Sequence, residues 1–125
     1  VAPGPLHTKY GCQVLQNIRN HSSRGSPAYY WPWMSNYLQG LQAGLFEVAR
    51  TVKRKAPLCI VVQDTHYKEL HVNLQRIVIE ILLGMDRSLH ARHDFAVTSS
   101  RSRMNPRARL HLRDRDNVES LLVFR

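Results

Sequence analysis

The chain has 125 residues, enough for one small domain, and it carries a formal net charge of +9 with a pI near 10.3. No apolar run approaches the roughly 18 residues that a membrane span requires, so a membrane protein is not expected. The two cysteines are too few for a disulfide framework, and we expect a reduced protein in the cytoplasm. A surface this basic attracts polyanions, so we expect nucleic acid as a partner, with charge that serves solubility alone as the alternative.

The segment of residues 1–32 is rich in proline, glycine and serine and has only a short apolar cluster. This composition predicts an irregular segment with one helical turn or two. The first residue is Val1, and no charged start, apolar core and small-residue cleavage site are found near it. We therefore expect the chain to be processed or to be a piece of a longer protein.

Residues 33–125 are predicted to form the α/β part of the chain, with a basic loop over residues 99–117. Apolar residues recur at helical spacing from Met34 to Val52, which predicts a helix over about residues 33–53. Pro57 prevents its continuation. The next residues, 58–62, form an unbroken apolar run rich in β-branched side chains, which predicts a central parallel strand that is buried on both faces and has Cys59 as a buried thiol.

Residues 63–71 are polar and are predicted to form the loop at the carboxyl end of this strand, the edge where α/β sheets bind ligands. A helix is expected to begin at Asn73, whose side chain can accept from a free backbone amide, and to end near Gly84. Alternating residues predict a strand over 89–97, and a last strand over 118–124 follows a polar connection. We expect the first two strands to be parallel and the last one antiparallel.

Polar side chains directly follow the first strand. They supply an acid, hydroxyls, an imidazole and an ammonium, and comprise Asp64, Thr65, His66, Tyr67 and Lys68. Polar groups at the end of a rigid strand are good material for a site. The alternative is an ordinary loop in which Asp64 and Thr65 satisfy backbone donors.

The basic loop 99–117 has six arginines and no lysine. Guanidinium groups bind phosphate in a two-pronged geometry that lysine cannot match, so this composition favours contact with a nucleic-acid backbone over a solvated or disordered loop. Asp114 and Asp116 neutralise the distal end. The predicted DNA-binding residues are therefore Arg101, Arg103, Arg107 and Arg109.

An aromatic cluster precedes and opens the long helix. Its members are Tyr29, Tyr30, Trp31, Trp33 and Tyr37. Such rings can stack an extruded base, or they can form a hydrophobic lid that packs the helix against a larger protein. The seven histidines do not predict a metal site, because zinc needs about four convergent ligands, and His90 and His93 should point to opposite faces of a strand.

Several of these segments together resemble a known family. The resemblance covers about 100 residues and is carried by four segments: Ser26–Asp64, Thr65–Glu69, Arg103–Ala108 and Val118–Arg125. These segments resemble the region downstream of the catalytic motif in site-specific DNA methyltransferases. Those enzymes belong to restriction–modification systems and modify adenine N6 or cytosine N4. The resemblance implies the carboxyl-terminal half of a Rossmann-like, class I α/β methyltransferase fold, with the final strand antiparallel between the two preceding strands. It also implies S-adenosylmethionine as the cofactor of the complete enzyme and DNA as its substrate, and places residues 64–68 beside the target-base pocket.

The chain departs from this family in what it lacks. The family's glycine-rich cofactor loop is absent, and Lys53–Pro57 lacks the glycines of the usual turn. Ser26–Pro27–Ala28–Tyr29 looks like a degenerate catalytic motif, but residues 18–25 are not a buried strand that could present it. We therefore expect the chain alone neither to bind the cofactor nor to methylate, and to require an amino-terminal partner segment. The alternatives are a stand-alone nucleic-acid-binding module and a non-catalytic remnant that docks on a complete methyltransferase.

Overall fold

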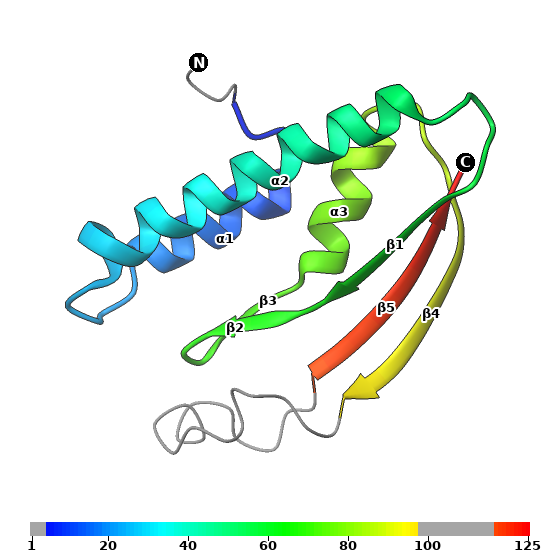
Figure 1. The fold of residues 1–125 in the computed structure, drawn as a ribbon. Helices are drawn as coiled ribbons and strands as arrows, with labels where there is room; N and C mark the ends of the chain where they lie inside the picture. Colours follow the sequence, from blue (N-terminus) through cyan, green and yellow to red (C-terminus); the bar gives the residue numbers. More distant parts are fainter. Residues whose placement is uncertain (1–4, 98–116) are drawn as a thin grey trace.

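The computed structural model describes residues 5–97 and 117–125, and it shows a mixed α/β arrangement. Its α-helices are α1 (Lys9–Arg19), α2 (Trp31–Thr51) and α3 (Leu74–Leu83), and a short π-helix, η1 (Ser26–Tyr30), leads directly into α2. The strands are β1 (Leu58–Gln63), β2 (Thr65–Tyr67), β3 (Leu70–Val72), β4 (Leu89–Val97) and β5 (Asn117–Phe124) (Figure 1). The four arginines predicted to bind DNA lie outside the described residues.

Three strands form one sheet in the order β1-β5-β4, and both outer strands are antiparallel to β5. Ile60 of β1 lies opposite Leu122 of β5, which in turn lies opposite Arg92 of β4. Because β1 and β4 are both antiparallel to β5, they run parallel to each other. The predictions of two parallel strands and of an antiparallel last strand inserted between them are confirmed.

The prediction that β1 is a central strand buried on both faces is wrong. Among the described residues β1 pairs only with β5, so it is an edge strand with an antiparallel neighbour. The described helices lie on one side of the sheet (Figure 1). Leu58 faces them and is buried, whereas Cys59 is exposed and Val61 is 63% exposed. The apolar run could indicate a strand but could not indicate which of its faces is covered in this chain.

The prediction for the amino-terminal segment is also wrong, because residues 9–19 form a helix of three turns rather than an irregular segment. Thr8 caps this helix, since its hydroxyl accepts from the Gly11 amide at 3.1 Å. Val14 and Ile18 are buried on its inner face. The proline and glycine content of the segment concealed a short amphipathic helix that is stabilised by tertiary packing.

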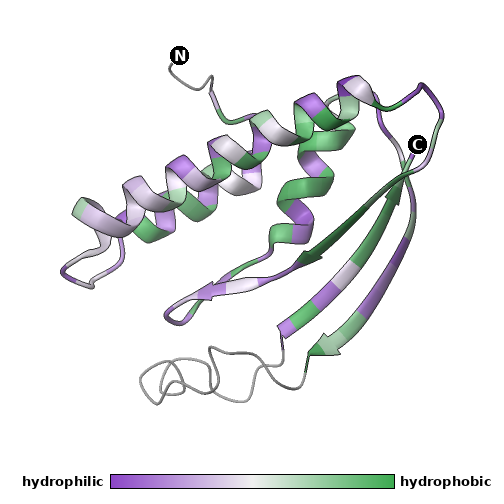
Figure 2. Cartoon of the chain, in the orientation of Figure 1, coloured by the Kyte–Doolittle hydropathy of each residue, from purple (hydrophilic) through white to green (hydrophobic). Residues whose placement is uncertain are grey.

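The two other predicted helices are confirmed with small shifts of their ends. Asn73 caps α3 by accepting from the Arg76 amide at 3.1 Å, and Gly84 follows its last residue. The helix α3 packs on β1 of the sheet, and α2 packs on α3 and α1. Leu122 and Phe124 on the inner face of the sheet are fully buried. Hydrophobic colouring runs along β1 and much of α3 (Figure 2). In the part of the chain that the structure describes, no helix is long and apolar enough to cross a membrane.

Candidate functional site: an aromatic pocket beside the hairpin

A pocket of about 620 Å³ lies between the start of α2 and the β2–β3 hairpin. Residues from α1, η1, α2, β2 and α3 line it: Ile18, Tyr29, Tyr30, Trp33, Met34, Tyr37, Thr65, His66, Tyr67 and Leu74. The hairpin replaces the loop that was predicted over residues 63–71. The aromatic cluster and the polar residues after β1, which are some thirty residues apart in sequence, therefore form one site.

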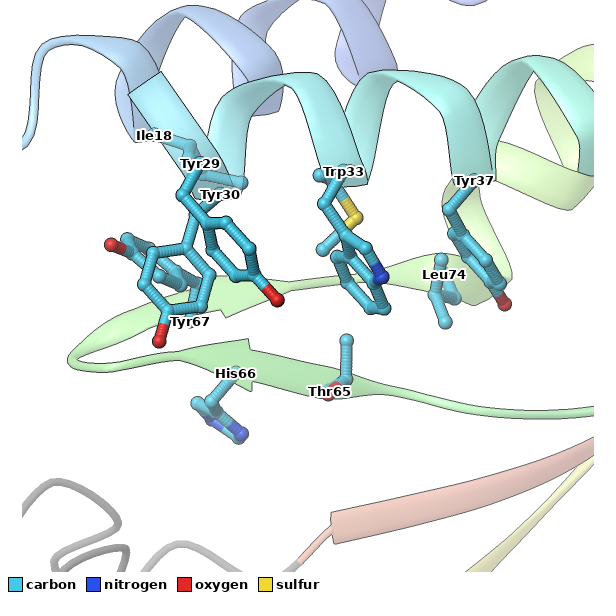
Figure 3. Close-up of a pocket in the computed structure, with 10 residues that line it drawn as sticks. Ile18, Tyr29, Tyr30, Trp33, Tyr37, Thr65, His66, Tyr67 and Leu74 are labelled. Atoms are coloured by element: carbon cyan, nitrogen blue, oxygen red, sulfur yellow. The ribbon is translucent and has the colours of Figure 1, made fainter. Parts of the chain in front are cut away.

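The pocket is lined by aromatic rings that remain accessible. Tyr29 is 65% exposed and Trp33 is 57% exposed, and Figure 3 shows both rings pointing from the helical segment toward the hairpin. Trp33 and Tyr37 are stacked, with ring centroids 6.0 Å apart and an interplanar angle of 8°. Clustered exposed aromatic side chains are unusual on a protein surface and typically mark a place where something binds.

Local sequence explains why the rings converge. In η1 the Tyr30 amide bonds to the Gly25 carbonyl at 3.2 Å, an i to i+5 pattern that widens the turn and presents consecutive tyrosines. Pro32 stands near the start of α2, where a missing amide hydrogen costs nothing. From there, Trp33 and Tyr37 are four residues apart and share one face of the helix.

Two contacts fix the hairpin against this aromatic segment. The hydroxyls of Ser26 and Tyr67 form a hydrogen bond, and both residues are buried. At the hairpin turn, Glu69 bonds to the His21 imidazole at 2.5 Å, and the His21 ring packs edge-on against Tyr67. The width of the pocket therefore depends on Tyr67, whose ring also packs against Tyr30 at 5.0 Å.

Asp64 holds the hairpin to the sheet instead of lining the pocket. One carboxylate oxygen accepts from the Val118 amide at 2.8 Å, and the other bonds to His71 Nε2 at 2.6 Å. Asp64 is 8% exposed, and its own amide donates to the Val118 carbonyl. This arrangement corresponds to the alternative in which Asp64 satisfies a backbone donor, and it ties the hairpin to the start of β5.

The other residues predicted beside the site lie around the hairpin. Thr65, His66 and Tyr67 line the pocket, and the His66 ring lies 4.9 Å from that of His71. Lys68 is at the hairpin turn with a φ of 54°, and its ammonium lies 5.9 Å from the Tyr67 ring centroid. Sequence reasoning did not select Ile18, Met34 and Leu74 as pocket residues, and no pattern in the sequence indicates them in this role.

Neither a tight glycine loop nor a cluster of metal ligands is found among the described residues. The described glycines are Gly11, Gly25, Gly40, Gly44 and Gly84, and none of them has the positive φ of a tight cofactor loop. No group of three or more His, Cys, Asp or Glu in residues 5–97 and 117–125 is placed to hold a metal ion. Ser26–Tyr30 is helical and follows turns, so Ser26–Pro27–Ala28–Tyr29 is not presented at a strand end.

The chemistry of the pocket suits a planar ring more than a charged group. Its walls offer ring faces, with the side chain of Thr65 on the same side of the hairpin, whereas the His66 ring points away from them to the other side (Figure 3). Its lining includes no carboxylate and no ammonium among the residues that the structure describes. Stacking with a few directed hydrogen bonds is the typical mode of recognition for a nucleobase. In comparisons with known proteins, no protein family, curated protein or solved structure matches this chain.

Proposed function

We propose that this chain is the carboxyl-terminal part of an S-adenosylmethionine-dependent DNA methyltransferase that modifies an exocyclic amino group of adenine or cytosine. The sheet order supports this proposal most directly. An antiparallel β5 lies between the parallel strands β1 and β4, which is the arrangement that the resemblance implies. A chain that crosses from β1 to β4 and returns between them is a more specific feature than a simple meander.

The aromatic pocket is the proposed site of the target base. A base that is rotated out of a duplex needs a ring face to replace the stacking that it loses, and exposed tyrosine and tryptophan rings provide such faces. Thr65 lies where it can contact the edge of a stacked base. The pocket is at the carboxyl end of β1, and β4 ends and β5 begins at this same end of the sheet. The basic loop with Arg101, Arg103, Arg107 and Arg109 connects those two strand ends and is proposed to contact DNA phosphates.

The sheet also supports the proposal that a partner segment completes the domain. Among the described residues, β1 has a free edge, and the outer face of the sheet exposes Cys59, Val61 and Phe95. Sheets with parallel strands in α/β domains are typically covered on both faces. An amino-terminal methyltransferase segment would cover this face, pair with β1 and supply the cofactor-binding and catalytic motifs.

The role of the pocket is tested with DNA that presents an extrahelical base. We expect a duplex with an unpaired adenine or cytosine to bind more tightly than the fully paired duplex, because the cost of unstacking is already met. Trp33→Ala should reduce this preference by about 5- to 150-fold, since base stacking on an aromatic ring contributes about 1–3 kcal/mol. Phe95→Ala is the matched control, because Phe95 is 59% exposed but lies on the sheet and outside the pocket. Equal effects of the two substitutions would rule out a base pocket at Trp33.

The enzymatic assignment is tested by calorimetric titration of S-adenosylmethionine. The chain alone should not bind it, whereas a longer polypeptide that includes the sequence encoded upstream of Val1 should bind it and methylate DNA. If the longer polypeptide binds DNA but not the cofactor, the chain is a nucleic-acid-binding module. Cofactor binding by the chain alone would contradict the proposed division between the two segments.

A further inference from the structure

A second pocket, of about 1020 Å³, lies at the other end of α2. It is formed where α2 ends, where the chain turns into β1 and β4, and where β5 ends. We call it the cationic groove; its charged and polar residues are Arg50, Arg54, Lys55, Asp86, Arg87, Ser88, His90 and Arg125. Neither the pocket beside the hairpin nor the proposed methyl transfer uses these residues.

Backbone contacts hold the groove in shape. Arg87 Nη2 donates to the carbonyls of Ala49 and Val52 at 2.8 and 3.2 Å, which caps the end of α2 with a cation. Ser88 and Arg125 exchange two backbone hydrogen bonds of 2.8 and 3.0 Å. Lys55 stands in a tight turn with a φ of 67°. Three sides of the groove are therefore anchored, so its long side chains project from fixed positions.

The groove has a large excess of positive charge. Five lysine and arginine side chains line it, against the single carboxylate of Asp86. Arg50 also pairs with Glu47 at 2.8 Å, but both side chains are mostly exposed and such a pair is weak in water. An excess of three positive charges remains when Glu47 is counted with Asp86. Like charges held this close repel one another, and a bound polyanion would remove that repulsion.

The chemistry of the lining favours phosphate on an extended chain over a lipid surface. Four of the five cations are arginines, whose planar guanidinium matches two phosphate oxygens at once. The surface is concave, and its apolar residues Ala49, Val52 and Met85 are buried or half-buried. None of the large exposed hydrophobic residues lies in it, so it lacks side chains that would insert into a bilayer.

The groove is separated from the aromatic pocket by most of α2. Trp33 and Arg50 are 17 residues apart on this helix, which at about 1.5 Å per residue corresponds to about 25 Å. Along one strand of DNA this distance is about seven nucleotides. A contact at the groove is therefore distinct from a contact at the pocket.

We propose that the cationic groove binds the phosphate backbone of nucleic acid as a second contact surface, separate from the aromatic pocket. This inference goes beyond the proposed function, because backbone binding at the groove needs neither the cofactor nor a target base. Arg54 and Arg125 are exposed and have no side-chain role in the fold among the contacts that the structure describes, so they are the residues to test.

The test is the salt dependence of DNA binding, measured by fluorescence anisotropy with a labelled duplex of about 24 base pairs, which is longer than the separation of the two sites. Each lost phosphate contact should reduce the slope of log K against log salt by about 0.9, so R54A/R125A should reduce it by about 2. Lys9→Ala is the control, because Lys9 is an exposed cation at the start of α1 and outside the groove. The same substitutions are made in a variant with alanine at residues 101, 103, 107 and 109, which separates the groove from the basic loop.

A reduced slope in both backgrounds, with no change for Lys9→Ala, supports the groove as a backbone site even if the chain is not part of a methyltransferase. An unchanged slope, or an equal reduction with Lys9→Ala, overturns it. Binding to phosphatidylserine vesicles is measured in parallel. Loss of vesicle binding without loss of DNA binding would also overturn the proposal, because the anion recognised would then be a lipid headgroup.

Discussion

The hydrogen bond between Ser26 and Tyr67 is expected to stabilise the pocket, and a double-mutant cycle measures its contribution. Ser26 is fully buried and Tyr67 is 8% exposed, so neither hydroxyl can readily exchange its partner for water. The perturbations are Ser26→Ala, Tyr67→Phe and the two together. Each single substitution removes one hydroxyl and leaves the other buried without this partner.

An unsatisfied buried polar group costs about 1–3 kcal/mol, so each single variant should lose about that much free energy of unfolding. The double variant removes both hydroxyls and leaves none stranded, so its cost should be near that of one single variant or below it. The sum of the two single losses should then exceed the double loss by about 1–3 kcal/mol. A coupling this large is expected only for groups in direct contact.

The assay is urea unfolding followed by far-ultraviolet circular dichroism, with Tyr29→Phe as the control. Tyr29 is 65% exposed, so the loss of its hydroxyl should change stability by less than about 0.5 kcal/mol. Additive effects of the two single substitutions would refute the reasoning. They would mean that the hairpin is not fastened to η1 through these hydroxyls.

Two further predictions concern the sheet and the carboxylates around it. Phe124→Ala should lower the free energy of unfolding by about 3–5 kcal/mol, because Phe124 is fully buried. Phe95→Ala should change it by less than about 0.5 kcal/mol, because Phe95 is exposed. Equal losses of the two variants in urea titrations would contradict a sheet that is covered on one face only. Hydrogen bonds from Ser120 and Arg92 hold the pKa of Asp94 below its ordinary value. The pKa of Glu80 is also lowered, because hydrogen bonds from Tyr10, Thr8 and Arg76 outweigh the raising effect of burial. Because a carboxyl group with a lowered pKa stabilises the fold above its unfolded pKa of about 4, this stability should be lost as pH falls through the folded value. In thermal unfolding at pH values from about 6 to 3, the Asp94→Asn and Glu80→Gln variants should lose less stability as pH falls than the unsubstituted chain. An unchanged dependence of stability on pH would refute the lowered pKa values of these carboxyl groups.

The sequence alone determined most of the secondary structure, because the relevant patterns are local. The helical spacing from Met34 onward, the cap at Asn73, the β-branched run at residues 58–62 and the alternation over 89–97 each correspond to an element of the structure. The order of the three strands also followed, since the resemblance implied an antiparallel last strand between two parallel ones. The helix α1 was missed because its few apolar residues become sufficient only when they pack against α2 and α3.

Tertiary structure decided which surfaces are covered and which residues meet. Cys59 and Val61 belong to a run that indicates burial, yet the described helices lie on one side of the sheet and leave these residues exposed. Asp64 belongs to a promising polar segment, yet its carboxylate is used by Val118 and His71. The aromatic cluster and the hairpin are far apart in the chain, and only folding brings Trp33 and Thr65 to the same pocket. A sequence pattern records which residues are apolar or charged, whereas contact between distant residues depends on how the elements pack.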